Sequence, residues 1–123
     1  DNIVDGCGFE IIKTSALIES VNKGSKRHKS ELCTLFIREN NNKFNINRIF
    51  PKKIYFRKDL RLTVDNPEDL IVCKKVYSFF KNKKISLKKI INFIDKNSYL
   101  KELIKPYCKN GYSKMYNWGK RKK

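Results

Sequence analysis

One carboxylate in this sequence stands where proteins commonly bind a metal ion. Asp65 ends a predicted strand, Arg61 to Asp65, in which Leu62 and Val64 share one face. A helix is predicted directly after it, and α/β proteins often place ligand-binding groups between a strand and the N-terminus of the next helix. Mg²⁺ usually takes one or two protein carboxylates and completes its shell with water and phosphate oxygens. Asp65 is therefore a candidate Mg²⁺ ligand.

The same acidic residues also have a purely structural interpretation. Asn66 is suited to cap the predicted helix, Pro67 fits its first position, and Asp69 completes a capping-box arrangement. Together with Asp65 and Glu68, Asp69 lies near the positive end of the helix, where a carboxylate stabilises by about 0.3–1 kcal/mol without any function. From the residue pattern alone, both roles remain open for Asp65.

Two segments resemble a known enzyme family. Residues 62–70, LTVDNPEDL, and residues 29–40, KSELCTLFIREN, look like motifs from the C-terminal half of the cytidylyltransferases that make CMP-activated sugars. The likeness is greatest to the spore-coat polysaccharide biosynthesis branch, and the acylneuraminate cytidylyltransferases are relatives. The resemblance covers about residues 5–95, with the matching segments in the family's order: Phe9 to Ser20, then Glu31 with Thr34 to Ile37, then Thr63 to Leu70.

Two departures from the family pattern shape what the resemblance implies. Leu32 stands where the branch often has histidine, and no segment resembles the Gly-rich basic loop that binds CTP. The resemblance therefore implies an α/β chain with a partial nucleotide-sugar transferase (Rossmann-like) fold, a C-terminal half without the N-terminal nucleotide-binding part. Such a chain is either a fragment of a longer enzyme or a truncated relative that has lost its nucleotide site.

The resemblance also implies an activity for the complete polypeptide: transfer of CMP from CTP to a sugar acid for surface polysaccharide biosynthesis, with release of pyrophosphate. Asp65 would bind Mg²⁺ together with a carboxylate from the absent half, so the isolated chain is expected to be inactive. Glu31 lies in the family's substrate motif. Arg27 and Lys29 are candidates to face an anionic substrate, with a solvated surface position as the alternative for both.

The rest of the chain alternates between segments typical of strands and of helices, which predicts an α/β fold. Strands or extended segments are predicted at Phe9–Ile12, around Phe44 and Ile46, around Ile54 and Phe56, and at Arg61–Asp65. Helices are predicted from Thr14 or Ser15 to Gly24, from Ser30 to the Asn40–Asn42 run, from Pro67, from Leu87, and from Ser98 to a point before Pro106.

We expect two regions. Residues 1–106 form the substrate-side and dimerisation portion, and residues 107–123 form a basic, aromatic tail that is poorly ordered. The adjacent apolar residues Leu35, Phe36 and Ile37 exceed what one core face of a helix requires, so a homodimer contact is expected there, with ordinary burial as the alternative.

The charge is the most unusual bulk property. The chain has 23 Lys, 6 Arg and a net charge of +17. The alternative class of function is thus a non-enzymatic basic module that binds nucleic acid or another polyanion. The lysines are spread along the whole chain, however, and Lys, Ile and Asn are all favoured by AT-rich codons. We therefore expect no nucleic-acid partner in the enzyme interpretation.

The cysteines and the hydropathy bear on the compartment. The four cysteines lie far apart without a CxxC pair, which favours reduced thiols in a cytoplasmic protein. No apolar run approaches the roughly 20 residues that a membrane-spanning helix needs, so no membrane association is expected.

Overall fold

The computed structural model describes residues 3–81 and 84–108, which fall into two compact units. The first unit comprises residues 3–8, 51–81 and 84–108, and the second comprises residues 9–50. Each unit has buried apolar residues of its own. Most of the predicted tail, residues 109–123, lies outside the described residues, whereas Tyr107 and Cys108 belong to the last helix of the first unit.

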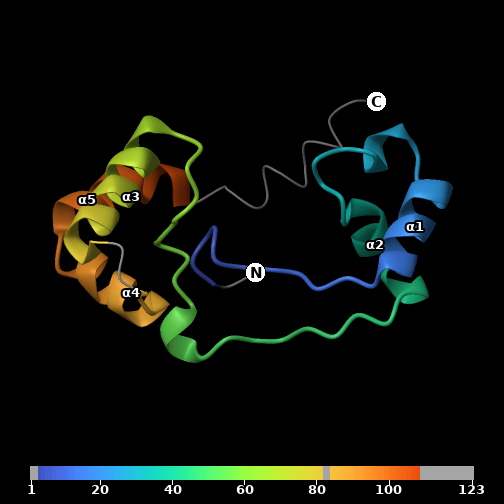
Figure 1. Cartoon of the computed structure of the whole chain (residues 1–123), viewed down its shortest axis with the longest axis horizontal. Coiled ribbons are helices and arrows are strands. Elements are labelled where there is room, and N and C mark those ends of the chain that lie inside the picture. The colour runs from blue at the N-terminus through green and yellow to red at the C-terminus, as the bar shows by residue number, and fades with distance from the viewer. Residues whose placement is uncertain (1–2, 82–83, 109–123) are drawn as a thin grey trace. The chain divides into compact units, whose positions relative to one another are not determined.

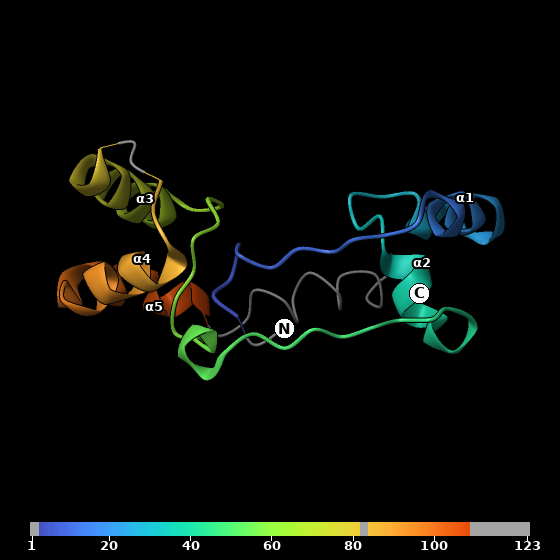
Figure 2. The ribbon, with the colours of Figure 1, turned by 60° about the horizontal axis from the view of Figure 1, so that its bottom comes forward.

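The first unit contains a short 3-10 helix, η3 (Lys53–Tyr55), and three α-helices, α3 (Pro67–Phe80), α4 (Leu87–Asp95) and α5 (Ser98–Cys108). The three α-helices pack against one another, as Figures 1 and 2 both show. Their apolar stripes meet two extended segments in a single core, which consists of Val4, Leu60, Val72, Val76, Ile91, Ile94, Leu100 and Ile104.

Helix α3 begins as its sequence predicts. Asn66 is the N-cap, Pro67 occupies the first turn, and the backbone N–H of Asn66 donates a 3.0 Å hydrogen bond to the Asp69 carboxylate. The helix ends at Phe80, and its C-cap, Lys81, adopts a left-handed conformation with φ of 48°. Among its apolar residues at helical spacing, Val72 and Val76 are buried, whereas Phe79 is 62% exposed.

The predicted starts of the next two helices are both confirmed. Ser86 is the N-cap of α4, and α5 begins at Ser98. The prediction that the last helix ends before Pro106 is wrong, because α5 continues through it to Cys108. Proline lacks an N–H group and therefore costs the helix one hydrogen bond, a loss that matters least in the last turn, where the burial of Leu100 and Ile104 holds the helix in place.

The second unit contains two α-helices, α1 (Thr14–Lys23) and α2 (Leu35–Glu39), and two 3-10 helices, η1 (Lys26–His28) and η2 (Asn41–Lys43). Its core consists of Leu35, Phe36 and Ile37, and the Phe36 ring lies edge-on to His28 and Phe44. The three residues proposed for a dimer contact are thus buried within their own unit. Helix α2 begins at Leu35 rather than at Ser30.

The expected α/β fold is wrong, because the described residues contain no strand. Residues 9–12 and 44–50 are not helical, and their backbones make no hydrogen bond to another described residue. Apolar side chains along them are exposed, including Phe9, Ile11 and Ile49. Alternating apolar residues favour an extended backbone, but a sheet also needs partner backbones beside it, and the pattern carries no information about those.

One isolated parallel bridge is the nearest approach to a sheet. The Asp5 N–H donates to the Leu60 carbonyl at 3.2 Å, and the Leu62 N–H donates to the Asp5 carbonyl at 2.7 Å. The chain then turns at Gly6, whose φ is +83°, and a Cβ there would lie 2.7 Å from the Thr63 nitrogen. Only glycine accommodates both the positive φ and the close approach to Thr63 without strain, so Gly6 allows the N-terminal segment to lie against residues 60–63.

A four-residue ion cluster joins the loop before Leu60 to α4 and α5. Arg57 donates to both carboxylate oxygens of Asp59, at 2.8 Å each, and to both of Asp95, at 2.5 Å each. Lys101 pairs with Asp59 at 2.8 Å and with Asp95 at 3.4 Å. The hydrogen bonds from Arg57 are the main cause that lowers the pKa of both carboxyl groups below the ordinary value of 3.8.

This cluster predicts a loss of stability in acid. Because the pKa values of the two carboxyl groups are lower in the folded state, the groups stabilise the fold above their unfolded pKa, near 4. This contribution to the free energy of unfolding is lost as the pH falls below that value. Both carboxylates are more than one third exposed, so we expect only about 1 kcal/mol in total. Urea unfolding between pH 6 and pH 2.5 measures it. In Arg57→Gln this component should be clearly smaller, because only Lys101 then still pairs with the two carboxylates, and an unchanged pH profile in that variant would contradict the assignment.

The described part of the chain offers no helix that is both long and apolar enough to cross a bilayer.

Candidate functional site

Arg61 organises the polar cluster around the segment that the sequence singled out. Its side chain is only 5% exposed, lies in the first unit, and contacts three groups with three different nitrogens. Nη2 donates to the Asp65 carboxylate at 2.6 Å, and Nη1 donates to the Tyr107 carbonyl at 3.1 Å. Nε lies 3.0 Å from Oδ1 of Asp69. The guanidinium thus connects the loop before α3, the first turn of α3 and the end of α5.

Asp69 is the buried anchor of the cluster. Its side chain is fully buried, and Oδ2 accepts hydrogen bonds from the backbone N–H groups of Asp65 and Asn66 at 3.2 and 3.0 Å. The Asn66 side-chain amide donates a third bond to the same oxygen at 2.9 Å. A carboxylate without a counter-ion is costly to bury, so the pairing of Asp69 with Arg61 is what permits its position.

Asp65 is the part of the cluster that solvent reaches. Its side chain is 66% exposed, and its Oδ2 accepts bonds from Arg61 and from the Thr63 hydroxyl, the latter at 3.2 Å. No described residue donates a hydrogen bond to its other oxygen, Oδ1. The buried Arg61 and Asp69 therefore hold the backbone and one oxygen of Asp65 in place while the second oxygen faces outward.

Unsatisfied polar atoms concentrate at this cluster. Among the described residues, three buried side-chain atoms have no hydrogen-bond partner: Arg61 Nε, Glu68 Oε2 and Asp69 Oδ1. Arg61 Nε and Asp69 Oδ1 lie 3.0 Å apart and form an ion pair, but their geometry does not meet that of a hydrogen bond. All three atoms belong to residues 61–69. Buried polar atoms are nearly always bonded in native proteins, so such a concentration distinguishes this part of the fold from the rest.

The cluster is acidic although the chain is strongly basic. One guanidinium (Arg61) pairs with two carboxylates (Asp65 and Asp69), which leaves one net negative charge. A hydrogen bond to Glu68 raises the pKa of the Tyr107 hydroxyl, so this neighbour remains neutral. The local field therefore attracts a cation rather than an anion.

The described residues fit a Mg²⁺ ion only as a partial site. No group of three or more His, Cys, Asp or Glu side chains among them is arranged to hold a metal. Asp69 is fully engaged by Arg61 and the helix cap. Asp65 can supply one outward oxygen, which suits an ion that takes most of its ligands from water and phosphate.

The cysteines take no part in this chemistry. All four are free, and burial is the main cause that raises the pKa of Cys7, Cys73 and Cys108. A raised pKa keeps a thiol protonated and unreactive at neutral pH.

The other predicted site residues lie in the second unit, apart in sequence and in packing from Asp65. Arg27 lies in η1 and pairs with Glu39. Lys29 and Glu31 are both exposed and form no ion pair with a described residue. Arg27 is thus committed to an internal contact, and the substrate roles predicted for the three residues remain predictions.

Sequence reasoning missed the roles of Arg61 and His28. His28 accepts a 2.8 Å bond from the Ser25 N–H at Nδ1, and its Nε2 lies 2.9 Å from Glu39. Since Nδ1 accepts, the proton is on Nε2 and is donated to Glu39. No sequence signal links residues 28 and 39. The sequence did carry a signal for Arg61, because an arginine between Leu60 and Leu62 in a buried segment needs an acidic partner.

Comparison with known proteins gives one distant similarity. The chain is 28% identical over 102 residues to an uncharacterised protein of Methanocaldococcus jannaschii. The alignment covers 83% of this chain and 42% of that protein, so the chain spans less than half the length of the relative. No protein-family model matches the chain, and no solved structure matches it.

Proposed function

We propose that this chain is a segment of a nucleotidyltransferase that transfers CMP from CTP to a sugar acid for surface polysaccharide biosynthesis. The observation that carries the proposal is the position of Asp65. It lies in the segment that resembles the cytidylyltransferases, and Arg61 and Asp69 hold it with one oxygen outward in an acidic cluster.

Two observations support the view that the chain acts together with further polypeptide. Apolar side chains along residues 9–12 and 44–50 are exposed, and the backbones of these segments lack hydrogen-bond partners among the described residues. Both features are costly in water, and additional chain packed against these segments would relieve them. The similar archaeal protein is more than twice as long as the aligned region.

The roles of the residues follow from their burial. Asp65 is the proposed ligand of Mg²⁺, a cofactor that neutralises phosphate charge when bound. Arg61 and Asp69 are positioning residues, because they fix the loop and the first turn of α3 without being exposed themselves. Glu31, Arg27 and Lys29 are proposed to contact the sugar acid or CTP in the complete enzyme. In the isolated chain the proposed metal site has a single carboxylate, so no turnover is expected.

The proposal includes a cytoplasmic location and a homodimer. Free cysteines and the cytoplasmic supply of CTP support the first. The exposed apolar side chains along residues 9–12 and 44–50 offer surface for the homodimer contact, because Leu35, Phe36 and Ile37 are buried.

The proposal is tested by measuring pyrophosphate release from CTP with a panel of nonulosonate and aldonate sugars. We expect turnover only when this chain is part of a polypeptide that also contains a CTP-binding half, and none from the 123-residue chain alone. Turnover by the isolated chain would contradict the segment proposal. A complete polypeptide that binds no CTP would exclude the enzyme altogether.

A further inference from the structure

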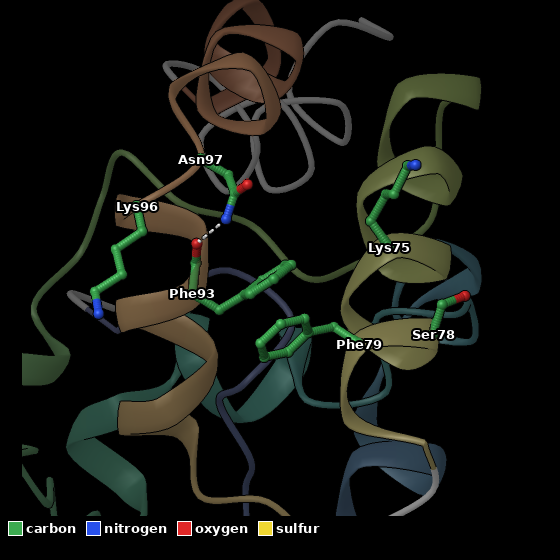
Figure 3. A pocket seen from close by; sticks show the side chains of 6 residues that line it. All are labelled: Lys75, Ser78, Phe79, Phe93, Lys96 and Asn97. Carbon is green, nitrogen blue, oxygen red and sulfur yellow. Dashed lines mark hydrogen bonds between the residues drawn. The ribbon is translucent and has the colours of Figure 1, made fainter.

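An open hollow lies on the surface of the first unit, away from the Arg61 cluster. It has a volume of about 540 Å³, within the range of small-ligand sites, and is formed where α3 meets the end of α4. Figure 3 shows the side chains that line it: Lys75, Ser78, Phe79, Phe93, Lys96 and Asn97.

Two aromatic rings form its floor. The ring centroids of Phe79 and Phe93 lie 4.4 Å apart with an angle of 33° between the ring planes, and Phe80 packs edge-on to Phe79 on the core side. Phe93 is half-buried, while Phe79 is 62% exposed. A phenylalanine that is held against a second ring and still shows most of its surface to solvent is a rigid platform on which another planar group can stack.

The charged groups around these rings are cations. Lys75 and Lys96 are exposed and form no ion pair with a described residue, and no acidic residue lines the hollow. Asp95, the nearest acid in sequence, is occupied by Arg57 and Lys101. Lys75 lies four residues before Phe79 and Lys89 lies four before Phe93, so each helix places a lysine one turn from its ring.

We propose that this hollow binds single-stranded nucleic acid, with a base stacked on Phe79 and neighbouring phosphates on Lys75 and Lys96. Stacking on an exposed aromatic ring combined with unpaired cations is how sequence-tolerant single-strand sites are built. The rings favour this ligand over an acidic peptide, and the net charge of +17 disfavours a second copy of the chain. This activity is independent of the proposed sugar-nucleotide chemistry.

The test uses a 5′-labelled uridine 12-mer and fluorescence anisotropy with the full chain at about 0.1 M salt. Phe79→Ala should weaken binding about tenfold. The matched control is Tyr77→Ala, which removes an aromatic ring of equal exposure from the same helix outside the hollow and should change the affinity less than twofold. A duplex of the same length, whose bases are already stacked, should bind at least tenfold more weakly than the single strand.

The lysines are tested by a second pair of variants. Lys75→Gln/Lys96→Gln should weaken binding at least threefold more than Lys74→Gln/Lys88→Gln, which removes the same charge from exposed positions that do not line the hollow. The proposal would be overturned if the two lysine double variants lost the same affinity, or if Phe79→Ala and Tyr77→Ala had the same effect. Equal binding of duplex and single strand would overturn it as well. Each of these results would leave only unspecific charge attraction. Phe79-dependent binding of an acidic phenylalanine-containing peptide with no binding of the 12-mer would overturn it in favour of a protein partner.

Discussion

Replacement of Arg61 by methionine is expected to lower the free energy of unfolding of the first unit by about 3–5 kcal/mol. Its guanidinium is almost fully buried and is the counter-ion of Asp69, whose side chain is completely buried. Removal of one partner of a buried pair leaves the other charge uncompensated, a loss of this size. Urea denaturation followed by helical circular dichroism measures it, since α3, α4 and α5 make up most of the unit's helix.

Two further variants separate the buried charge from a simple packing defect. In Arg61→Met/Asp69→Asn both charges are absent, and the asparagine can still accept the bonds that cap α3, so about 2 kcal/mol should be regained relative to Arg61→Met alone. Asp65→Asn, by contrast, should cost less than about 1 kcal/mol because its side chain is 66% exposed. If the double variant is less stable than Arg61→Met, the ion pair is not what holds the segment.

Asp65→Asn in the complete polypeptide is expected to reduce pyrophosphate release from CTP by a hundredfold or more. Asparagine keeps the size of the side chain and can accept the bonds from Arg61 and Thr63, so the fold should survive. It lacks the negative charge with which Asp65 is proposed to hold Mg²⁺, and a deficit of about 3 kcal/mol in transition-state stabilisation corresponds to that loss of rate. This prediction rests on the proposed function.

The control for this variant is Asp59→Asn, which also neutralises an aspartate of the first unit but lies in the Arg57 cluster. It should retain turnover within about threefold. The Mg²⁺ concentration needed for half-maximal activity should rise in Asp65→Asn and stay constant in Asp59→Asn. Near-normal turnover of Asp65→Asn with an unchanged Mg²⁺ requirement would remove Asp65 from the site.

The local sequence by itself determined where α3, α4 and α5 begin, although it misplaced the start of α2. Asn66, Pro67 and Asp69 predict the start of α3 to the residue, because the capping box satisfies backbone groups with side chains only a few positions away. Ser86 also marks the start of α4, although its side chain makes no capping hydrogen bond. The core faces of these helices were also predictable, since Val72, Val76, Ile91 and Ile94 recur at helical spacing. The importance of residues 62–70 followed from the same kind of local information.

Only the tertiary structure decided which segments meet. The sequence pattern predicts strands or extended segments at Phe9–Ile12 and around Phe44 and Ile46, but their backbones make no hydrogen bond to another described residue, because strand pairing depends on distant parts of the chain. The exposure of Ile18, Val21 and Phe79 has the same origin, since a helical stripe is buried only where another element covers it. The contact of Arg61 with Asp69 and with the Tyr107 carbonyl joins groups up to 46 residues apart. Local propensity selects backbone conformation, whereas the burial and pairing of charge arise only when remote segments exclude water together.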